Sequence, residues 1–406
     1  MSFKRSYNLI SWVFYDFANS PYSTIMTTLI FPIFFMESIV STKWAMLIWA
    51  ILYGGSEIFA AIFSPLMGAL SDILRRRKIF VIAFSLLSIF GTLLTATLQK
   101  GDILKAFFFF FLAQIGFSLS LVFYNSLLEQ ISELEKREWV SGFGWGMGYL
   151  GGMTFMALMI FFSSFESQKF IKLNFLYTAL WYLIFSFPIF FFFEKRISLK
   201  VDKVLFRDAY KEVIKTIKKL KDHKNLFLFI LASFFLNDGV NSAILFGGIY
   251  LRKIYNFDLK NLYLFFIAFN LIAAVGAFLI GFLADKIGSK KTLNIITFLW
   301  IISIIFLPFL ENLYYLLSVA SLIGILIGGT QSVLRGFLST LAPSSSQGEW
   351  FGFYSLVGKA ASLFGPLLFG ATYGISENLK LSALSLIPLF LLGYFFLVYV
   401  QECKYK

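Results

Sequence analysis

Runs of apolar residues, each broken by a short polar stretch, set the pattern along this chain of 406 residues. A helix that crosses the hydrocarbon core of a bilayer needs roughly 20 apolar residues. Windows of that length predict twelve membrane-spanning helices, over residues 9–36, 44–69, 79–98, 105–128, 139–163, 171–193, 225–251, 261–285, 291–309, 313–337, 350–373 and 381–400. The pattern therefore predicts an all-α integral membrane protein.

The connections between these spans are short, except for a polar and basic segment over residues 195–224. This segment predicts two bundles of six helices, residues 1–194 and residues 225–406, joined by a cytoplasmic linker. Within the linker, Leu205, Ala209 and Val213 share helical spacing and lysines flank them, which is typical of an amphipathic helix on the inner membrane surface. A solvated linker fits the same pattern equally well.

The start of the chain resembles a secretory signal peptide, because Lys4 and Arg5 precede an apolar run. Asp16 interrupts that run, however, and no small-residue cleavage site follows it. We therefore expect the run to remain as the first membrane span.

Composition excludes several classes of protein. Charged residues make up 14% of the chain, against about a quarter in soluble domains. Cys403 and His223 are the only cysteine and histidine, so we expect no intrachain disulfide, no metal site and no cofactor. The sequence also lacks the phosphate-binding loop Gly-x4-Gly-Lys-Ser/Thr, which argues against an ATP-driven pump.

The net charge of +13 arises from lysines and arginines in the segments that connect the spans. When the N-terminus is placed in the cytoplasm, most lysines and arginines of the loops lie on the inner side, as the positive-inside rule requires. We therefore expect a multi-pass protein of the cell membrane with both termini in the cytoplasm. The basic residues then face anionic lipid, and nucleic acid is not needed as a partner.

Four short motifs recur in the second half of the chain in the same order. The pairs are Asp16-Phe-Ala-Asn19-Ser20 with Asp238-Gly-Val-Asn241-Ser242, Gly68–Asp72 with Gly281–Asp285, Asn125–Glu129 with Gln331–Arg335, and Glu138-Trp139 with Glu349-Trp350. Six spans separate each pair, so the copies have the same orientation in the membrane. Such a parallel repeat places a site between two halves that can rock.

The second copy of the loop motif, Gly281-Phe-Leu-Ala-Asp285-Lys286-Ile-Gly288-Ser-Lys290-Lys291, resembles the signature loop of the major facilitator superfamily. The first copy is less faithful, because Arg75 stands where the family usually has glycine. The stretches YDFANSPY, SGFGWGMGYLGG, LNDGVNSA, GGTQSVLRGFLSTLAP and FGFYSLVGKAASLFGPLLFG together resemble the vacuole-effluxer branch, whose fungal members are autophagy-related amino-acid exporters.

This resemblance implies two pseudo-symmetric bundles of the major facilitator fold. It also implies a monomeric secondary active transporter, which moves a small solute by rocker-switch alternating access, with protons or sodium as the candidate coupling ions. Amino-acid efflux is the substrate expectation. A carrier of a sugar, an organic anion or a drug-like compound, a membrane-embedded enzyme, and a scaffold or receptor without transport are the alternatives.

Ionisable and amide side chains at membrane depth are the candidate site, because they are costly in hydrocarbon. In the first span, Asp16, Asn19 and Ser20 share one helix face. Pro21 has no N–H to donate to the carbonyl of Phe17, which frees that oxygen as a ligand or strains the helix. The other interpretation is a hydrogen-bonded staple between helices, without a role in transport.

The seventh span repeats this arrangement. Asn237, Asp238 and Asn241 form its polar face and Gly239 loosens the helix. We expect both polar faces to bind substrate or a coupling ion, together with Gln331 of the tenth span.

Lys359 lies about nine residues, or roughly 13 Å, into the eleventh span. A buried ammonium at that depth calls for an acidic partner, for which Asp16 and Asp238 are the candidates. With an amino acid as substrate, Lys359 or Arg335 would hold its carboxylate and an aspartate its amine. A structural ion pair is the alternative.

Glu129 and Arg335 occupy equivalent positions in the repeat, and their opposite charges suggest an ion pair that closes an inner gate. By resemblance, Asp72 and Asp285 face the N-termini of helices in the neighbouring half, where a carboxylate is favourable. Glu57, in the middle of the second span, is either a proton carrier or a buried neutral acid without a role.

Overall fold

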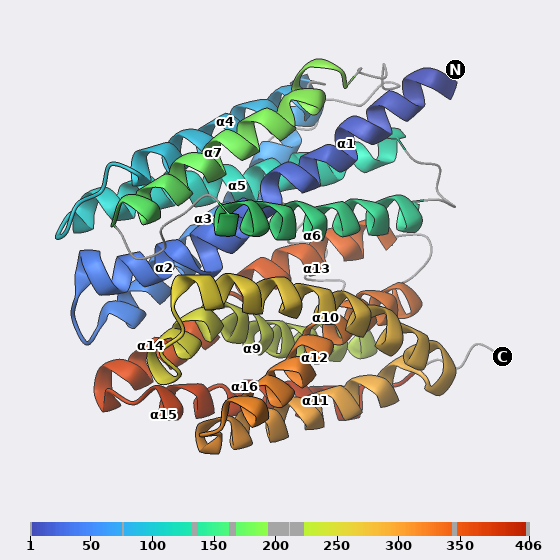
Figure 1. Cartoon of the computed structure of the whole chain (residues 1–406). Coiled ribbons are helices and arrows are strands. Elements are labelled where there is room, and N and C mark those ends of the chain that lie inside the picture. Colours follow the sequence, from blue (N-terminus) through green and yellow to red (C-terminus); the bar gives the residue numbers. More distant parts are fainter. Residues whose placement is uncertain are drawn as a thin grey trace. The chain divides into compact units, whose positions relative to one another are not determined.

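The computed structural model describes residues 2–74, 77–131, 137–161, 168–193, 211, 223–342 and 347–402. These residues form helices and short connections, and the part of the chain described contains no strand (Figure 1). The elements are α1 (Ser2–Tyr22), η1 (Ser23–Thr28), α2 (Ile30–Phe34), η2 (Phe35–Val40), α3 (Ala45–Leu74), α4 (Arg77–Thr95), α5 (Ile103–Ile131), α6 (Arg137–Phe161), α7 (Gln168–Phe191), α9 (Lys224–Ile254), α10 (Leu259–Ile287), α11 (Ser289–Phe306), η4 (Leu307–Phe309), α12 (Leu313–Leu341), α13 (Gln347–Ala360), α14 (Phe364–Ser376), α15 (Leu379–Leu384) and α16 (Ile387–Tyr399).

Within these described residues, eleven helical stretches are long and apolar enough to cross a membrane. The predicted span that is not among these stretches is the eleventh, residues 350–373, which falls on α13 and α14 with residues 361–363 between them. Each of the twelve predicted spans therefore has a helical counterpart, and the all-α membrane fold is confirmed.

The first span is not one regular helix. After Tyr22 it continues through two π-helical stretches, η1 and η2, with α2 between them. The hydroxyls of Thr27 and Thr28 both donate to the carbonyl oxygen of Ser23, at 2.5 and 3.3 Å. These side chains compete with the backbone for the same acceptor, which favours wider turns of the helix.

The chain folds into two compact units. The first unit contains residues 1–42, 59–210 and 257–267, and the second unit contains residues 43–58, 211–256 and 268–406. The units follow the two predicted bundles except that α3 begins in the second unit and α10 begins in the first. Most of the predicted linker lies outside the described residues, so its amphipathic helix and the exact domain limits stay predictions.

Glycines bring helices of the first unit into close contact. A Cβ atom added to Gly91 of α4 would lie 2.6 Å from the nitrogen of Ala113, and one on Gly116 of α5 would lie 2.5 Å from the nitrogen of Ser88. Small residues of this kind let helix backbones approach in a membrane, where packing replaces the hydrophobic effect as the source of association.

In the second unit, α9 packs against α16, α14, α13 and α12. Gly239 of α9 lies against the ring of Phe390, to which an added Cβ atom would come within 2.6 Å. The outer face of α10 is apolar and exposed, with Phe278, Leu279 and Phe282 more than half exposed. In a bilayer this surface contacts acyl chains.

The loop motif of the second half ends α10 and begins α11. Gly288, between the two helices, has a φ angle of +95°, a conformation that glycine adopts without steric cost. Gly288 offers no side chain to cap α11, and Glu402 fills that role: its Oε1 atom accepts hydrogen bonds from the backbone nitrogens of Ser289, at 2.6 Å, and Lys290, at 3.4 Å. The end of the described chain is thus fastened to the start of α11.

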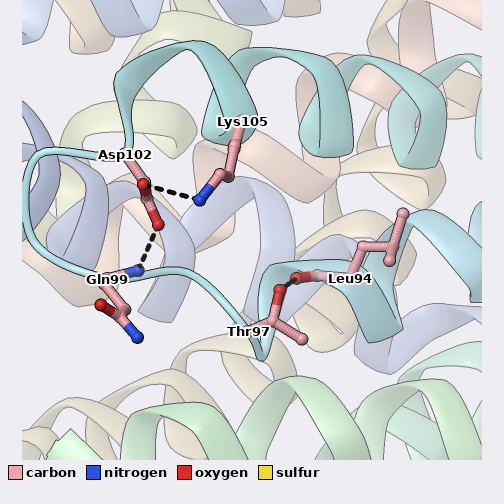
Figure 2. A network of polar contacts seen from close by, with 5 residues as sticks. All are labelled: Leu94, Thr97, Gln99, Asp102 and Lys105. Atoms are coloured by element: carbon pink, nitrogen blue, oxygen red, sulfur yellow. Dashed lines mark hydrogen bonds and ion pairs between the residues drawn. The ribbon is translucent and has the colours of Figure 1, made fainter.

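The loop between α4 and α5 is fastened by Asp102 (Figure 2). Its carboxylate accepts hydrogen bonds from the backbone nitrogen of Gln99 at 3.0 Å and from Lys105 Nζ at 3.1 Å. The bond from Lys105 is the main reason that the pKa of Asp102 lies below its ordinary value. The loop is exposed, so this pair orders the turn and adds little stability.

Candidate functional site

Asp16 lies on α1 in the first unit, where the hydroxyl of Tyr124 on α5 donates a hydrogen bond of 2.6 Å to its Oδ2 atom. Trp12 stacks on Tyr124 with ring centroids 4.5 Å apart, and its Nε1 atom donates to the backbone oxygen of Tyr124 at 3.1 Å. The carboxylate is therefore held by a neutral hydroxyl. No cation pairs with it among the described residues.

Glycines of α6 make room for this polar face. A Cβ atom on Gly144 would lie 2.5 Å from Asp16 Oδ2, and one on Gly148 would lie 2.7 Å from Ser20 Oγ. Ser20 Oγ itself donates to the backbone oxygen of Asp16 at 2.9 Å. In the sequence this glycine-rich stretch contributes only to the family resemblance, whereas in the structure it lets α6 approach the polar face of α1.

The carbonyl that Pro21 leaves without a helical donor is that of Phe17. Trp181 of α7 donates its Nε1 hydrogen to this oxygen at 3.2 Å, and Gly151 of α6 packs directly on the backbone of Phe17. The prediction that the carbonyl is free to act as a ligand is therefore wrong. A third helix supplies the missing donor, as usually happens at prolines in membrane helices.

A buried hydroxyl network lies one residue from Asp16. The hydroxyl of Tyr15 contacts Ser85 Oγ at 2.6 Å and the hydroxyl of Tyr182 at 2.8 Å, and the latter contacts Ser120 Oγ at 3.2 Å. The network links α1, α4, α5 and α7. Sequence reasoning missed it, because tyrosine and serine in apolar helices give no signal of their partners.

In the second unit, the polar face of α9 bonds to the interrupted span. Asn237 Nδ2 donates to the hydroxyl of Tyr354 at 3.3 Å, and Asn241 Nδ2 donates to Ser362 Oγ at 3.1 Å. Asp238 Oδ2 accepts from the backbone nitrogen of Gly365 at 2.9 Å. Three side chains of α9 thus hold α13, the break and α14.

Asp238 takes the place of a helix cap. The residue before α14, Leu363, has no side chain that can accept from the first turn, and Asp238 accepts from Gly365 in that turn instead. Its side chain is fully buried, and its second oxygen, Oδ1, has no hydrogen-bond partner in the described ranges of the chain.

The break itself has a signal in the sequence that a count of apolar residues does not register. Pro366 cannot donate to the carbonyl of Ser362, and proline is favoured in the first turn of a helix. The pair Gly365-Pro366 therefore marks a helix start, and α14 begins one residue before it.

Lys359 lies in the last turn of α13, and the carboxylate that interacts with it electrostatically is Glu57 of α3. Glu57 was not among the predicted partners; of those, Asp238 accepts a hydrogen bond from Gly365 of α14, and Asp16 lies in the first unit, so its pairing with Lys359 stays a prediction. Tyr53 lies one helical turn before Glu57, and its hydroxyl reaches Ser362 in the break. Glu57 is buried and Lys359 half-buried.

The remaining candidate residues lie on helices, and the structure gives few contacts for their side chains. Asn19 is buried and its side chain acts on the Asp16 carboxylate, although its Nδ2 atom makes no hydrogen bond of normal geometry in the described part of the chain. Gln331 is half-buried on α12, Arg335 is exposed there and interacts electrostatically with Tyr354, and Asp285 is exposed in the last turns of α10. The side chains of Asp72 and Glu129 lie outside the described residues, so the predicted gates stay predictions.

Comparison with known proteins shows which protein family this chain resembles. A family model described as vacuole effluxer Atg22 like matches residues 42–406. An uncharacterized MFS-type transporter of Bacillus subtilis (strain 168), YxiO, is 29% identical over 97% of this chain and 94% of its own length. Autophagy-related protein 22-2 of Aspergillus clavatus is 21% identical over 59% of this chain and 44% of its own length.

Among solved structures, the nucleoside transporter NupG superposes with a TM-score of 0.74 over 98% of this chain and all of its own, at 12% identity. At that identity the likeness shows the fold alone. It confirms the major facilitator fold that the resemblance implied.

Proposed function

The chain belongs to the vacuole effluxer Atg22-like family, a family of multi-pass MFS-type transporters, and we propose that it exports amino acids by rocker-switch alternating access. The family description supports efflux, and amino acids are the solutes that the charges of the site fit best. In this proposal the protein is a monomer of the cell membrane with both termini in the cytoplasm, and it is not an enzyme.

One observation carries the substrate class. The charge of Glu57 acts on Lys359, which lies in the last turn of α13 beside the break before α14, at a depth where single charges are costly. A carboxylate-bearing solute can replace Glu57 as the partner of Lys359, which keeps the ammonium paired throughout. Asp16 on α1 of the first unit, whose carboxylate accepts a hydrogen bond of 2.6 Å from the hydroxyl of Tyr124, stays the predicted ligand for an amine.

The other predicted residues have secondary roles in this proposal. Asn19, Ser20, Asn237, Asn241 and Gln331 contribute polar contacts to the transported solute. Asp72, Glu129, Asp285 and Arg335 act in opening and closing the cytoplasmic side.

Counterflow in liposomes tests the proposal. Purified protein is reconstituted, the vesicles are loaded with unlabelled solute, and uptake of labelled amino acids, sugars, nucleosides and organic anions is compared. We expect saturable counterflow of at least one amino acid, lost in Lys359→Ala and kept in Lys380→Ala, which removes a half-buried lysine of α15. Uptake of a sugar or nucleoside instead, unchanged in Lys359→Ala, would refute the amino-acid assignment.

The charge pair can be tested separately from transport. Glu57→Gln removes the carboxylate that faces Lys359, and loss of one partner of a buried pair costs about 3–5 kcal/mol. Adding Lys359→Met removes the ammonium as well and should recover most of that loss in a denaturant titration. If the double variant is as unstable as the sum of the single variants, the two side chains do not interact.

A further inference from the structure

The polar face of α9 contains a buried carboxylate, one of whose two oxygens has no hydrogen-bond partner among the described residues. Asp238 lies near the middle of α9, a membrane-spanning helix of 31 residues. Oδ2 accepts one backbone hydrogen bond, from Gly365 at 2.9 Å, whereas Oδ1 is fully enclosed and has no partner among the described residues. A carboxylate in such a place is far more costly as an anion than as a neutral acid.

The charged and titratable groups of the surrounding helices serve other partners. Lys359 interacts with Glu57, Arg335 with Tyr354, and Tyr354 with Asn237. The other such groups whose side chains the structure describes, on α9 itself or on the helices packed against it, are Lys224, Tyr250, Arg252, Lys253, Tyr314, Tyr315, Tyr373, Lys380, Tyr394 and Tyr399. Within the described residues, none of these groups interacts electrostatically with Asp238.

We propose that Asp238 is the site at which this transporter binds its coupling proton, and that the proton controls the joint between α13 and α14. The proton enters on Oδ1, because Oδ2 is engaged by Gly365. In the charged form, the carboxylate binds the first turn of α14 and holds the joint. In the neutral form, it loses the charge-assisted part of that bond, and α14 is released from α9.

The packing favours a proton over a sodium ion. A sodium ion needs several oxygen ligands at once, such as freed backbone carbonyls, whereas Oδ1 of Asp238 is enclosed and has no hydrogen-bond partner within the described ranges. The space next to Gly365 is filled: an added Cβ atom would lie 2.9 Å from Leu389 and 3.0 Å from the backbone oxygen of Asp238. Ser242 Oγ is already used, because it donates to that same backbone oxygen at 2.6 Å.

The coupling role of this proton rests on the proposed function. The test therefore measures the protonation of Asp238 and the opening of the joint between α13 and α14, both without any solute. The full-length protein in liposomes is titrated from mildly acidic to mildly alkaline pH, and the infrared C=O band of protonated carboxyl groups is followed. We expect one component of the titrating band to be lost in Asp238→Asn and in Asp238→Ser. It should remain in Asp102→Asn, which removes the half-buried carboxylate of the α4–α5 loop.

The two Asp238 variants also guard against misfolding, because asparagine and serine can both still accept the hydrogen bond of a helix cap. Amide hydrogen exchange measures how often the start of α14 opens: in Asp238→Asn, the amides of residues 363–365 and 367 should exchange about tenfold faster than in wild type at alkaline pH. At acidic pH the two proteins should exchange alike.

Three results would overturn the proposal. These are an infrared titration that is unchanged in both Asp238 variants, a band that responds to sodium at constant pH instead of to pH, and exchange at α14 that is unaffected by the substitution. Failure of the proposed transport function is a different result, because the titration would be intact while neither the wild type nor any variant showed counterflow.

Discussion

Replacing Trp181 by phenylalanine tests how the first span tolerates Pro21. The substitution keeps an aromatic ring against Phe17, whose ring stacks on Trp181 with centroids 5.2 Å apart, and removes the hydrogen bond of 3.2 Å to the Phe17 carbonyl. That oxygen then has no donor, since Pro21 cannot supply one.

Two general values set the expected loss of stability in Trp181→Phe. A buried acceptor left without a partner costs about 1–3 kcal/mol, and single interhelical hydrogen bonds in a membrane average about 0.6 kcal/mol. We therefore expect Trp181→Phe to destabilise the protein by about 1–2 kcal/mol. In a Pro21→Ala background, the new N–H of residue 21 can bond to Phe17 within the helix, and the cost of Trp181→Phe should fall to about half.

Unfolding titrations with a denaturing detergent on the four proteins of this cycle measure the coupling. The coupling energy should differ from zero, because the cost of losing the indole depends on whether residue 21 can donate. Equal costs of Trp181→Phe with and without Pro21 would show that the indole packs beside Phe17 without serving its carbonyl, and the account of the first span would be wrong.

Two further predictions concern packing and capping. Gly151→Ala puts a methyl group against the backbone of Phe17 and should cost about 1–3 kcal/mol in the same titration, whereas Gly146→Ala, which meets open space, should be near neutral; equal effects would refute the close contact of α1 with α6. Glu402→Ala removes the acceptor for the first amides of α11 and should cost about 0.5–2 kcal/mol, seen as faster hydrogen exchange at Ser289 and the residues that follow it; unchanged exchange there would show that the cap does not hold α11.

The sequence alone determined the class of fold. Lipid accepts only helices or closed barrels, so apolar stretches of the right length have one structural outcome, and the twelve predicted spans have helical counterparts. The repeated motif likewise located Asp16 and Asp238 on polar helix faces, because three-residue spacing is a local property of a helix.

The sequence repeat did not predict that its two aspartates have different hydrogen-bond partners. Asp16 is bound by a tyrosine side chain of α5, and Asp238 by a backbone nitrogen at the start of α14. Equivalent positions in a duplicated chain share their place along the helix, but their partners come from segments that have diverged independently.

Only the tertiary structure decided the partners of the buried polar groups. Lys359 faces Glu57, about 300 residues earlier in the chain, and the carbonyl exposed by Pro21 receives a hydrogen bond from Trp181 on α7. The reason is physical. Whether a segment enters the membrane depends on its own transfer free energy, a sum over neighbouring residues. Which donor meets which acceptor depends on how distant helices pack, and no local pattern records that.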